Sequence, residues 1–115
     1  MRYSKKSFDE AVWHAVASIK PGHVMSYGEV ARAAGFPRHA RMVSKAMGRS
    51  PGQLPWHRVV RSDRTLAFEV NTEAYSRQKR LLEQEGAVFR NGKVISAGSD
   101  EAEDLDKLIW GPSEN

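Results

Sequence analysis

Apolar residues near the start of the chain are spaced three or four positions apart. This spacing predicts an amphipathic helix over residues 8–19. Ser7 and Glu10 form a capping-box pattern at its start, and Pro21-Gly22 marks its end. The apolar positions of this helix are Phe8, Val12, Ala15, Val16 and Ile19.

Two shorter helices are predicted after this turn. Ser26-x-x-Glu29 is a second capping box, which opens a helix that continues to about Ala34, and Gly35 suits its C-terminal cap. Pro37 then leads into a third helix over residues 38–48. Two short helices joined by a turn that contains glycine outline a helix-turn-helix.

The second half of the chain mixes extended and helical patterns. Residues 57–60, HRVV, predict a short strand, and residues 65–70, TLAFEV, predict another extended piece. Residues 75–86 predict a helix that ends at Gly86. Asn91-Gly92 lies between two apolar arms within residues 87–95, and this is a strong hairpin signal.

Together these elements predict an α+β fold, mostly helical, with the plan of a winged-helix-like DNA-binding domain. We expect one such domain over residues 1–95, because 115 residues provide for a single modest core. Residues 96–115 are expected to form an acidic C-terminal tail with a small apolar cluster. That cluster consists of Leu105, Leu108, Ile109 and Trp110.

Charge is divided unevenly between these two parts. The tail holds six acids and one base, so the overall net charge of +4 conceals a net charge of +9 on residues 1–95. A surplus of this size favours a polyanionic partner, most simply nucleic acid, although a merely soluble basic surface has similar support from charge alone.

Composition excludes several kinds of site. The chain has no cysteine, which excludes disulfides, thiolate metal ligands and a cysteine nucleophile. Its four histidines lack metal-ligand spacing, so no metal or other cofactor is expected. No apolar run is long enough to span a membrane, and the first residues do not resemble a signal peptide.

Basic residues recur along the third predicted helix. Arg38, Arg41, Lys45 and Arg49 are three or four positions apart, so they are predicted to share a face suited to phosphates. Small or apolar residues lie between them where a groove floor would approach the helix. These are Ala40, Met42, Ser44 and Ala46.

The motifs then match a known family in one unbroken order over about residues 8–95. The chain resembles the C-terminal domain of O6-alkylguanine-DNA alkyltransferases, which carry segments like TYGEIA, ARAV, PCHRV and LLxxEG. The corresponding segments here are residues 26–31 (SYGEVA), 40–43 (ARMV), 55–59 (PWHRV) and 81–86 (LLEQEG).

One departure from the family pattern bears directly on function. In the alkyltransferases the residue before His-Arg-Val is the cysteine that accepts the alkyl group, whereas here it is Trp56. An indole cannot replace a thiolate as the nucleophile. PWHRV is the pattern of the alkyltransferase-like proteins, which bind O6-alkylguanine in DNA without transferring the alkyl group.

The resemblance implies a role for each matching residue. Arg41 is expected to enter the base stack and Tyr27 to help rotate the target nucleotide, with Arg38, Ala40, Met42, Ser44 and Lys45 also meeting DNA. His57 and Glu85 are expected to hold the pocket's hydrogen bonds rather than to catalyse. The implied lesion pocket consists of Tyr27, Met47, Trp56, His57, Val59, Ser62 and Glu85.

Two segments depart further from the alkyltransferase pattern. Ser50-Pro51 replaces an Asn-Pro step in a shorter loop, and residues 67–75, AFEVNTEAY, replace a Gly-rich cover over the pocket. A basic residue that touches the lesion is expected in this second segment. Glu69 is acidic, so Arg64 is the nearest basic candidate.

The expected function is therefore non-enzymatic recognition of O6-alkylguanine in duplex DNA by base flipping. In the family the lesion is passed to nucleotide excision repair, so those repair proteins are expected partners of a monomer. The expected place is the nucleoid in the cytoplasm of a bacterium, or the nucleus of a eukaryote.

Two other classes of function stay open from the residues alone. The first is an enzyme, either an alkyltransferase with an unusual acceptor or a hydrolase built on His57. The second is a helix-turn-helix transcription regulator, although Ala40, Met42 and Ser44 suit a shallow groove contact better than a hydrogen-bond code.

Overall fold

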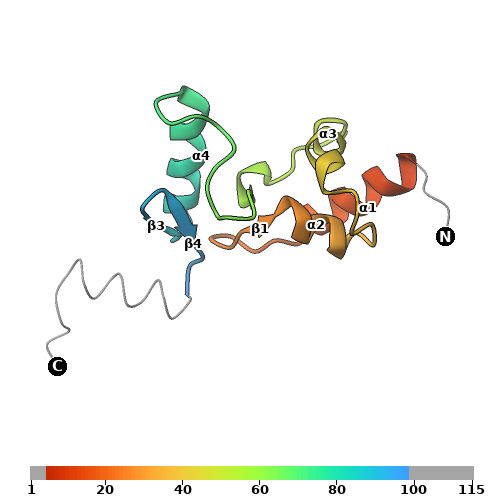
Figure 1. Cartoon of the computed structure of the whole chain (residues 1–115), viewed down its shortest axis with the longest axis horizontal. Coiled ribbons are helices and arrows are strands. Elements are labelled where there is room, and N and C mark those ends of the chain that lie inside the picture. Colours follow the sequence, from red (N-terminus) through yellow and green to blue (C-terminus); the bar gives the residue numbers. More distant parts are fainter. Residues whose placement is uncertain (1–4, 99–115) are drawn as a thin grey trace, which may run out of the picture.

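Helices and short strands make up the fold of residues 5–98, which are the residues that the computed structural model describes (Figure 1). The two strand pairs are separate, since β1 pairs with β2 in parallel and β3 pairs with β4 in an antiparallel hairpin. The α+β, mostly helical fold is therefore confirmed. In chain order the elements are α1 (Lys5–Ala17), β1 (Met25–Ser26), α2 (Tyr27–Ala33), the 3-10 turn η1 (Ala40–Met42), α3 (Val43–Gly48), the 3-10 turn η2 (Trp56–Arg58), β2 (Val59–Val60), α4 (Glu73–Gln84), β3 (Val88–Arg90) and β4 (Lys93–Ile95).

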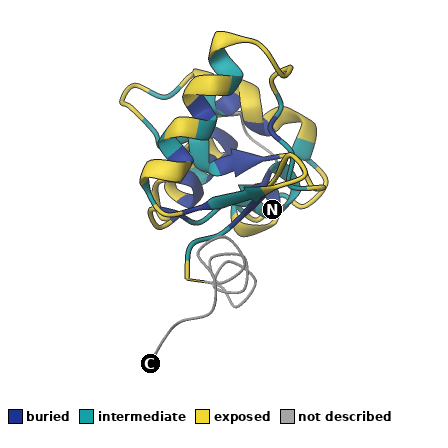
Figure 2. Cartoon of the chain, turned by 90° about the vertical axis from the view of Figure 1, so that its left-hand side faces the viewer, coloured by how far each residue is buried: buried dark blue, intermediate teal, exposed yellow. Residues whose placement is uncertain are grey.

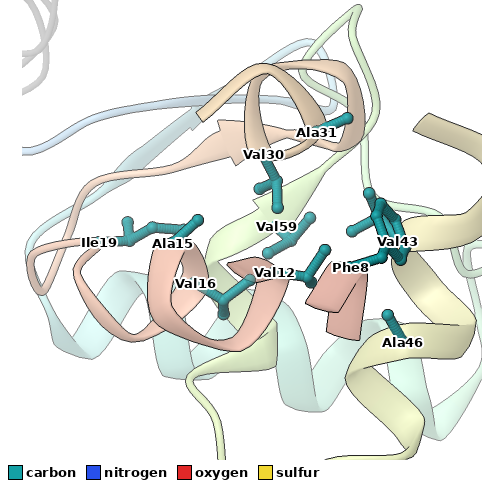
Figure 3. Packing of buried hydrophobic residues seen from close by; sticks show 10 residues of the cluster. All are labelled: Phe8, Val12, Ala15, Val16, Ile19, Val30, Ala31, Val43, Ala46 and Val59. Atoms are coloured by element: carbon teal, nitrogen blue, oxygen red, sulfur yellow. The ribbon is translucent and has the colours of Figure 1, made fainter. Parts of the chain in front are cut away.

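The main core joins α1, α2, α3 and β2 (Figure 3). Phe8 packs edge-to-face on Phe36 with ring centroids 5.3 Å apart, and the Trp13 indole N–H donates to the Ala46 carbonyl at 2.7 Å. Each fully buried Val or Phe contributes roughly 1.5–3 kcal/mol relative to exposure. The members of this main core are Phe8, Val12, Ala15, Val16, Ile19, Val30, Ala31, Val43, Ala46 and Val59.

A second, smaller core lies beneath the hairpin and α4. Val60 directly follows the last residue of the first core but belongs to the second, where it packs with Leu66, Leu82 and Val94. In Figure 2 the buried residues lie on the strands and on the inner helix faces, while the outer helix faces are exposed. The strand pair β1–β2 therefore connects the helical half of the molecule to the hairpin half.

The capping box at the start of α2 is confirmed. The Ser26 hydroxyl accepts from the Glu29 N–H at 3.1 Å, and the Glu29 carboxylate accepts from the Ser26 N–H at 2.8 Å. At the other end Gly35 has a φ of 89°, and the N–H of Phe36 donates to the Ala31 carbonyl at 2.8 Å. This Schellman arrangement ends the helix where the sequence predicts.

The third predicted helix is not continuous, so that prediction is wrong in its first half. Residues 40–42 form the 3-10 turn η1 and the α-helix begins only at Val43, while Arg38 lies in the preceding turn. His39 makes no capping hydrogen bond through its side chain. Without a side-chain cap for the first N–H groups, the chain enters the helix through tighter 3-10 hydrogen bonds.

The first predicted capping box is also wrong. Helix α1 begins at Lys5, so Ser7 lies inside the helix instead of capping it. Lysine is a good helix former, so the two residues before Ser7 extend the helix towards the N-terminus. The helix ends at Ala17, two residues earlier than predicted, although Ile19 is still buried.

Strand predictions in the middle of the chain need correction. Residues 56–58 form the 3-10 turn η2, and only Val59 and Val60 are extended. Their partner strand Met25–Ser26 was not predicted, because two residues are too few to show an alternating pattern. Residues 65–70 form a loop in which Thr65 alone makes an isolated bridge, to Lys93.

The last helix and the hairpin are confirmed. Thr72 caps α4 by accepting from the Tyr75 N–H at 3.2 Å, and Gly86, with a φ of 99°, ends it. In the hairpin Asn91 and Gly92 have φ values of 53° and 77°. Positive φ at both central residues is the signature of a type I′ turn, which matches the twist of paired strands.

Gly22 lies in the turn after α1 and packs against the hairpin half of the molecule. Its substitution should lower the free energy of unfolding. Its φ is 81°, and a Cβ there would lie 2.5 Å from the Glu85 carbonyl oxygen and 2.8 Å from Ala97 Cβ. Gly22→Ala should therefore cost more than about 1–2 kcal/mol, the penalty of the left-handed backbone alone. Urea denaturation measures the loss; Gly52→Ala, where no atom lies within 4 Å, is the control. Equal midpoints for the two variants would contradict this packing.

Two further expectations concern the acidic C-terminal tail and the absence of a membrane-spanning segment. Residues 99–115 lie outside the described residues, and they include the predicted apolar cluster and most of the acidic tail. The boundary at residue 95 therefore stays a prediction. Among residues 5–98, every helix is too short or too polar to cross a bilayer.

Candidate nucleic-acid interface

The start of α2, the turn η1 and the loop after β2 surround an open hollow of about 670 Å³, which we call the Arg41 hollow. Tyr27 reaches it from the first position of α2, and Arg41 reaches it from η1. Small residues between them leave room for a large ligand to approach the backbone. The lining residues are Tyr27, Gly28, Ala40, Arg41, Ser44, Arg61, Ser62, Asp63 and Ala67.

A second hollow of about 310 Å³ adjoins the first and shares Tyr27 and Ser44 with it. We call it the Trp56 pocket. Trp56 and Met47 give it large apolar walls, while Val59 and Gln78 belong to the buried interior behind it. Its lining residues are Tyr27, Ser44, Met47, Gly48, Trp56, Val59, Phe68 and Gln78.

Aromatic and cationic groups fix the indole of Trp56. Phe68 meets it edge-to-face with centroids 6.2 Å apart, and the His57 ring does the same at 6.0 Å. The Arg77 guanidinium lies 5.9 Å from the ring centroid, within the range of a cation–π interaction. Phe68 is 42% exposed, so it forms a partly open wall at the mouth of the pocket.

His57 and Glu85 form a hydrogen-bonded pair, with Nε2 and Oε2 2.9 Å apart. Arg58, which the sequence reading did not single out, holds Glu85 more firmly. Its Nε and Nη2 donate to the two carboxylate oxygens at 3.0 Å and 2.6 Å, while its Nη1 donates to the Ile19 carbonyl at 2.8 Å. The Gly22 N–H adds a further hydrogen bond to Glu85 Oε1 at 2.9 Å.

This arrangement makes Glu85 a structural anchor instead of a proton acceptor. The bidentate Arg58 guanidinium lowers the pKa of Glu85 to about 2, with help from the Gly22 N–H and His57. A carboxylate with so low a pKa is a poor general base at neutral pH. The His57 ring contacts Trp56 and is hydrogen-bonded to Glu85, but neither His57 nor Glu85 lines the Trp56 pocket.

The low pKa of Glu85 predicts an acid-dependent loss of stability. Its stabilisation should be complete above its ordinary pKa of 4.5 and should be lost as pH falls towards about 2. Urea midpoints of the wild type and Glu85→Gln should therefore differ most at neutral pH and converge in acid. A difference that does not change with pH would show that Glu85 contributes nothing through its charge.

Tyr27 lies where the two hollows meet. Burial raises the pKa of its phenol, and nearby Arg61 opposes the rise through its positive charge. Tyr27 therefore stays a neutral hydrogen-bond donor with an aromatic face. Such a side chain can contact both a nucleotide backbone and a base.

The predicted DNA-binding residues line the Arg41 hollow or lie beside it. Ala40, Arg41 and Ser44 line the Arg41 hollow, whereas Arg38, Met42 and Lys45 are exposed beside it. Of the predicted pocket residues, Tyr27, Met47, Trp56 and Val59 line the Trp56 pocket, while Ser62 lines the Arg41 hollow.

One member of the predicted basic face points elsewhere. Arg49 binds Asp9 of α1 through two hydrogen bonds of 2.6 Å, so it fastens α3 to α1. Asp9 is 6% exposed, which makes this pair part of the packing. The predicted face for phosphates therefore excludes Arg49, because its charge is already matched.

Arg64, the basic candidate for the lesion, is also engaged. Its guanidinium donates to the two oxygens of Glu29 at 2.8 Å and 3.2 Å, and this pairing lowers the pKa of Glu29 to about 2. Arg61 lines the Arg41 hollow instead. Sequence reasoning missed Arg61, Phe68 and Arg77, because none belongs to a motif and only the folded chain brings them to Tyr27 or Trp56.

No three histidine, aspartate or glutamate side chains within residues 5–98 come together as a metal site. The lining of the Trp56 pocket is largely apolar and aromatic, with Tyr27, Ser44 and Gln78 as polar members. Such a surface can bind a planar base and stack on it.

Comparison with known proteins connects this geometry to DNA. The family "6-O-methylguanine DNA methyltransferase, DNA binding domain" matches residues 7–87. A "DNA base-flipping protein" of Escherichia coli (strain K12) is 39% identical over 106 residues, which cover 90% of this chain and 74% of that protein. "Alkyltransferase-like protein 1" of Schizosaccharomyces pombe is 41% identical over 81 residues, which cover 69% and 75%.

Solved structures of proteins bound to DNA are also similar to this chain. The chain is similar to S. pombe Atl1 in complex with damaged DNA containing O6-carboxymethylguanine, with a TM-score of 0.64 and 34% identity. The match covers 89% of this chain and 96% of that one. A second complex of the S. pombe protein with DNA matches with a TM-score of 0.65 and 35% identity over the same shares.

Proposed function

This chain belongs to the family of the 6-O-methylguanine DNA methyltransferase DNA-binding domain, and we propose that it recognises O6-alkylguanine in duplex DNA without transferring the alkyl group. It does so by base flipping, and it leaves the lesion chemically intact. The relatives named as base-flipping and alkyltransferase-like proteins support this, as does the likeness to Atl1 bound to damaged DNA.

The observation that carries the proposal is the position of Trp56. It occupies the place of the acceptor cysteine in the alkyltransferase motif, and it lines a pocket together with Tyr27, Met47 and Phe68. The chain has no cysteine elsewhere that could take the alkyl group. The pocket therefore retains a surface for binding an alkylated base, but it lacks the thiolate that attacks the alkyl carbon.

Recognition requires the target base to leave the duplex. In the proposed complex Arg41 enters the base stack from η1, and its planar guanidinium stacks on and hydrogen-bonds to the orphaned cytosine. Ala40 and Ser44 allow the backbone to approach the minor-groove floor. Tyr27 supports the rotated nucleotide at the junction of the two hollows, from which the base enters the Trp56 pocket.

Binding of matched duplexes tests this proposal. Two duplexes that differ only in guanine or O6-methylguanine at one position are titrated with the protein, and affinity is followed by fluorescence anisotropy. The duplex with O6-methylguanine should bind more tightly at every salt concentration. Equal affinities would contradict lesion recognition and would instead favour general DNA binding.

Further steps in the cell are part of the same proposal. The protein acts as a monomer, because one chain lines both hollows, and it marks the lesion for nucleotide excision repair proteins in the compartment that holds the DNA. A reconstituted excision assay checks the last step. Incision near O6-methylguanine should rise when the protein is added, and Arg41→Ala should not produce this rise.

A further inference from the structure

A third hollow, of about 450 Å³, lies between the hairpin and the loop after β2. We call it the hairpin hollow. It shares Ser62 and Asp63 with the Arg41 hollow, so the two form one track along the surface. Its lining residues are Ser62, Asp63, Arg64, Arg90, Asn91, Lys93, Val94 and Ile95.

Two exposed cations lie directly opposite each other on this hairpin. Arg90 of β3 pairs in register with Lys93 of β4, next to the turn. Like charges directly opposite each other destabilise a strand pair. Within residues 5–98 neither side chain forms an ion pair. An anion held between the two side chains would remove this repulsion.

The other charges on the hairpin hollow cancel this pair only in part, since Asp63 lies close enough to Lys93 for their charges to interact. Arg64 is matched by Glu29, and Asp63 is the one acid among the eight lining residues. The Asp63 carboxylate accepts from the N–H and hydroxyl of Thr65 at 3.0 Å and 2.6 Å. Arg90 and Lys93 thus leave an excess of positive charge at the end of the track.

Backbone hydrogen bonds connect the hairpin to the rim of the Arg41 hollow. The Val94 N–H donates to the Arg64 carbonyl at 2.9 Å, and the Arg61 N–H donates to the Thr65 carbonyl at 3.0 Å. Arg64 binds Glu29, which is two residues from Tyr27 on α2. Figure 1 places the hairpin at the opposite end of the molecule from α3, so this connection bridges two distant cationic sites.

From this geometry we infer that the β3–β4 hairpin is a second DNA contact, which binds backbone phosphates on one side of the lesion through Arg90 and Lys93. The inference rests on the proposed function, because it extends the same DNA along the track from Arg41. The contact is to phosphates and carries no base information. It therefore adds affinity for damaged and undamaged DNA alike.

Charge-removing variants combined with shortened DNA test this contact. Anisotropy titrations over a range of salt compare the wild type, Arg90→Gln, Lys93→Gln and their double variant. Each lost phosphate contact should reduce the salt slope of log K by about 0.9, and the double variant by roughly 1.8. Arg80→Gln removes an exposed charge of α4 that lines none of the three hollows, and it should leave the slope unchanged.

Duplex length then locates the contact. One duplex ends just beyond the lesion on one side, and another ends just beyond it on the other side. The variants should match the wild type on one of these duplexes and remain weaker on the other. Unchanged slopes for the double variant, or equal losses on both shortened duplexes, would overturn the inference. A wild type that does not prefer O6-methylguanine would instead contradict the proposed function.

Discussion

Arg41→Ala is expected to remove most of the preference for O6-methylguanine over guanine. Arg41 lies on η1 at the wall of the Arg41 hollow, where it can fill the gap that a flipped base leaves. Hydrogen bonds to a charged group contribute about 1.5–3 kcal/mol. Its loss should therefore weaken lesion binding on the order of ten- to a hundredfold, as measured by paired titrations of damaged and undamaged duplexes.

Arg38 and Lys45 provide matched controls for Arg41. Both are exposed on either side of η1, so each is expected to bind a phosphate and not a base. Alanine at either position should weaken binding to both duplexes alike and reduce the salt slope by about one unit. If Arg41→Ala changes both affinities in parallel, as Lys45→Ala should, Arg41 does not enter the base stack.

Trp56→Ala should produce a comparably large loss by a different route. The indole forms the main apolar wall of the pocket and is fixed by Phe68, His57 and Arg77. Stacking of one base on an aromatic side chain contributes about 1–3 kcal/mol. The variant should therefore lose roughly 5- to 150-fold in affinity for the damaged duplex, with little change for plain DNA. Trp56→Phe keeps an aromatic face, and it should retain much of the preference.

A cysteine at the same position should not create an efficient enzyme. Trp56→Cys would place a thiol next to His57, but Arg58 already holds Glu85 as a structural carboxylate. Residues 67–75, of which only Phe68 lines the Trp56 pocket, also replace the Gly-rich segment that the alkyltransferase resemblance implies. In-line attack loses about a hundredfold in rate for an error of about 1 Å, so we expect slow transfer or none. Fast stoichiometric methyl uptake by this variant would show that Trp56 alone separates the chain from its enzymatic relatives.

Local signals in the sequence predicted the parts of the fold that local hydrogen bonds determine. The Ser26–Glu29 capping box, the glycine ends of α2 and α4 and the Asn91-Gly92 turn depend on residues within a few positions of each other. Each was predicted, and each is present. The family resemblance added Trp56 and Tyr27 to this picture, because their roles follow from aligned motifs and not from spacing.

Distant pairings could not be predicted in this way. Met25 pairs with Val59, Arg58 with Glu85, and Arg64 with Glu29, and each pair is far apart along the chain. The basic spacing of the third predicted helix was misleading for Arg49, because a folded partner on α1 neutralises it. Charge periodicity indicates a candidate face, but the tertiary partners determine which cations remain available for DNA.

One measurement tests directly whether the protein binds O6-methylguanine in DNA without altering it. The protein is incubated at saturation with duplex containing the lesion, and the intact protein and the released nucleosides are then analysed by mass spectrometry. The protein mass should stay unchanged, and O6-methylguanine should be recovered in full from the saturated duplex. A protein that has gained one methyl group, with a matching loss of the lesion from the DNA, would contradict this expectation.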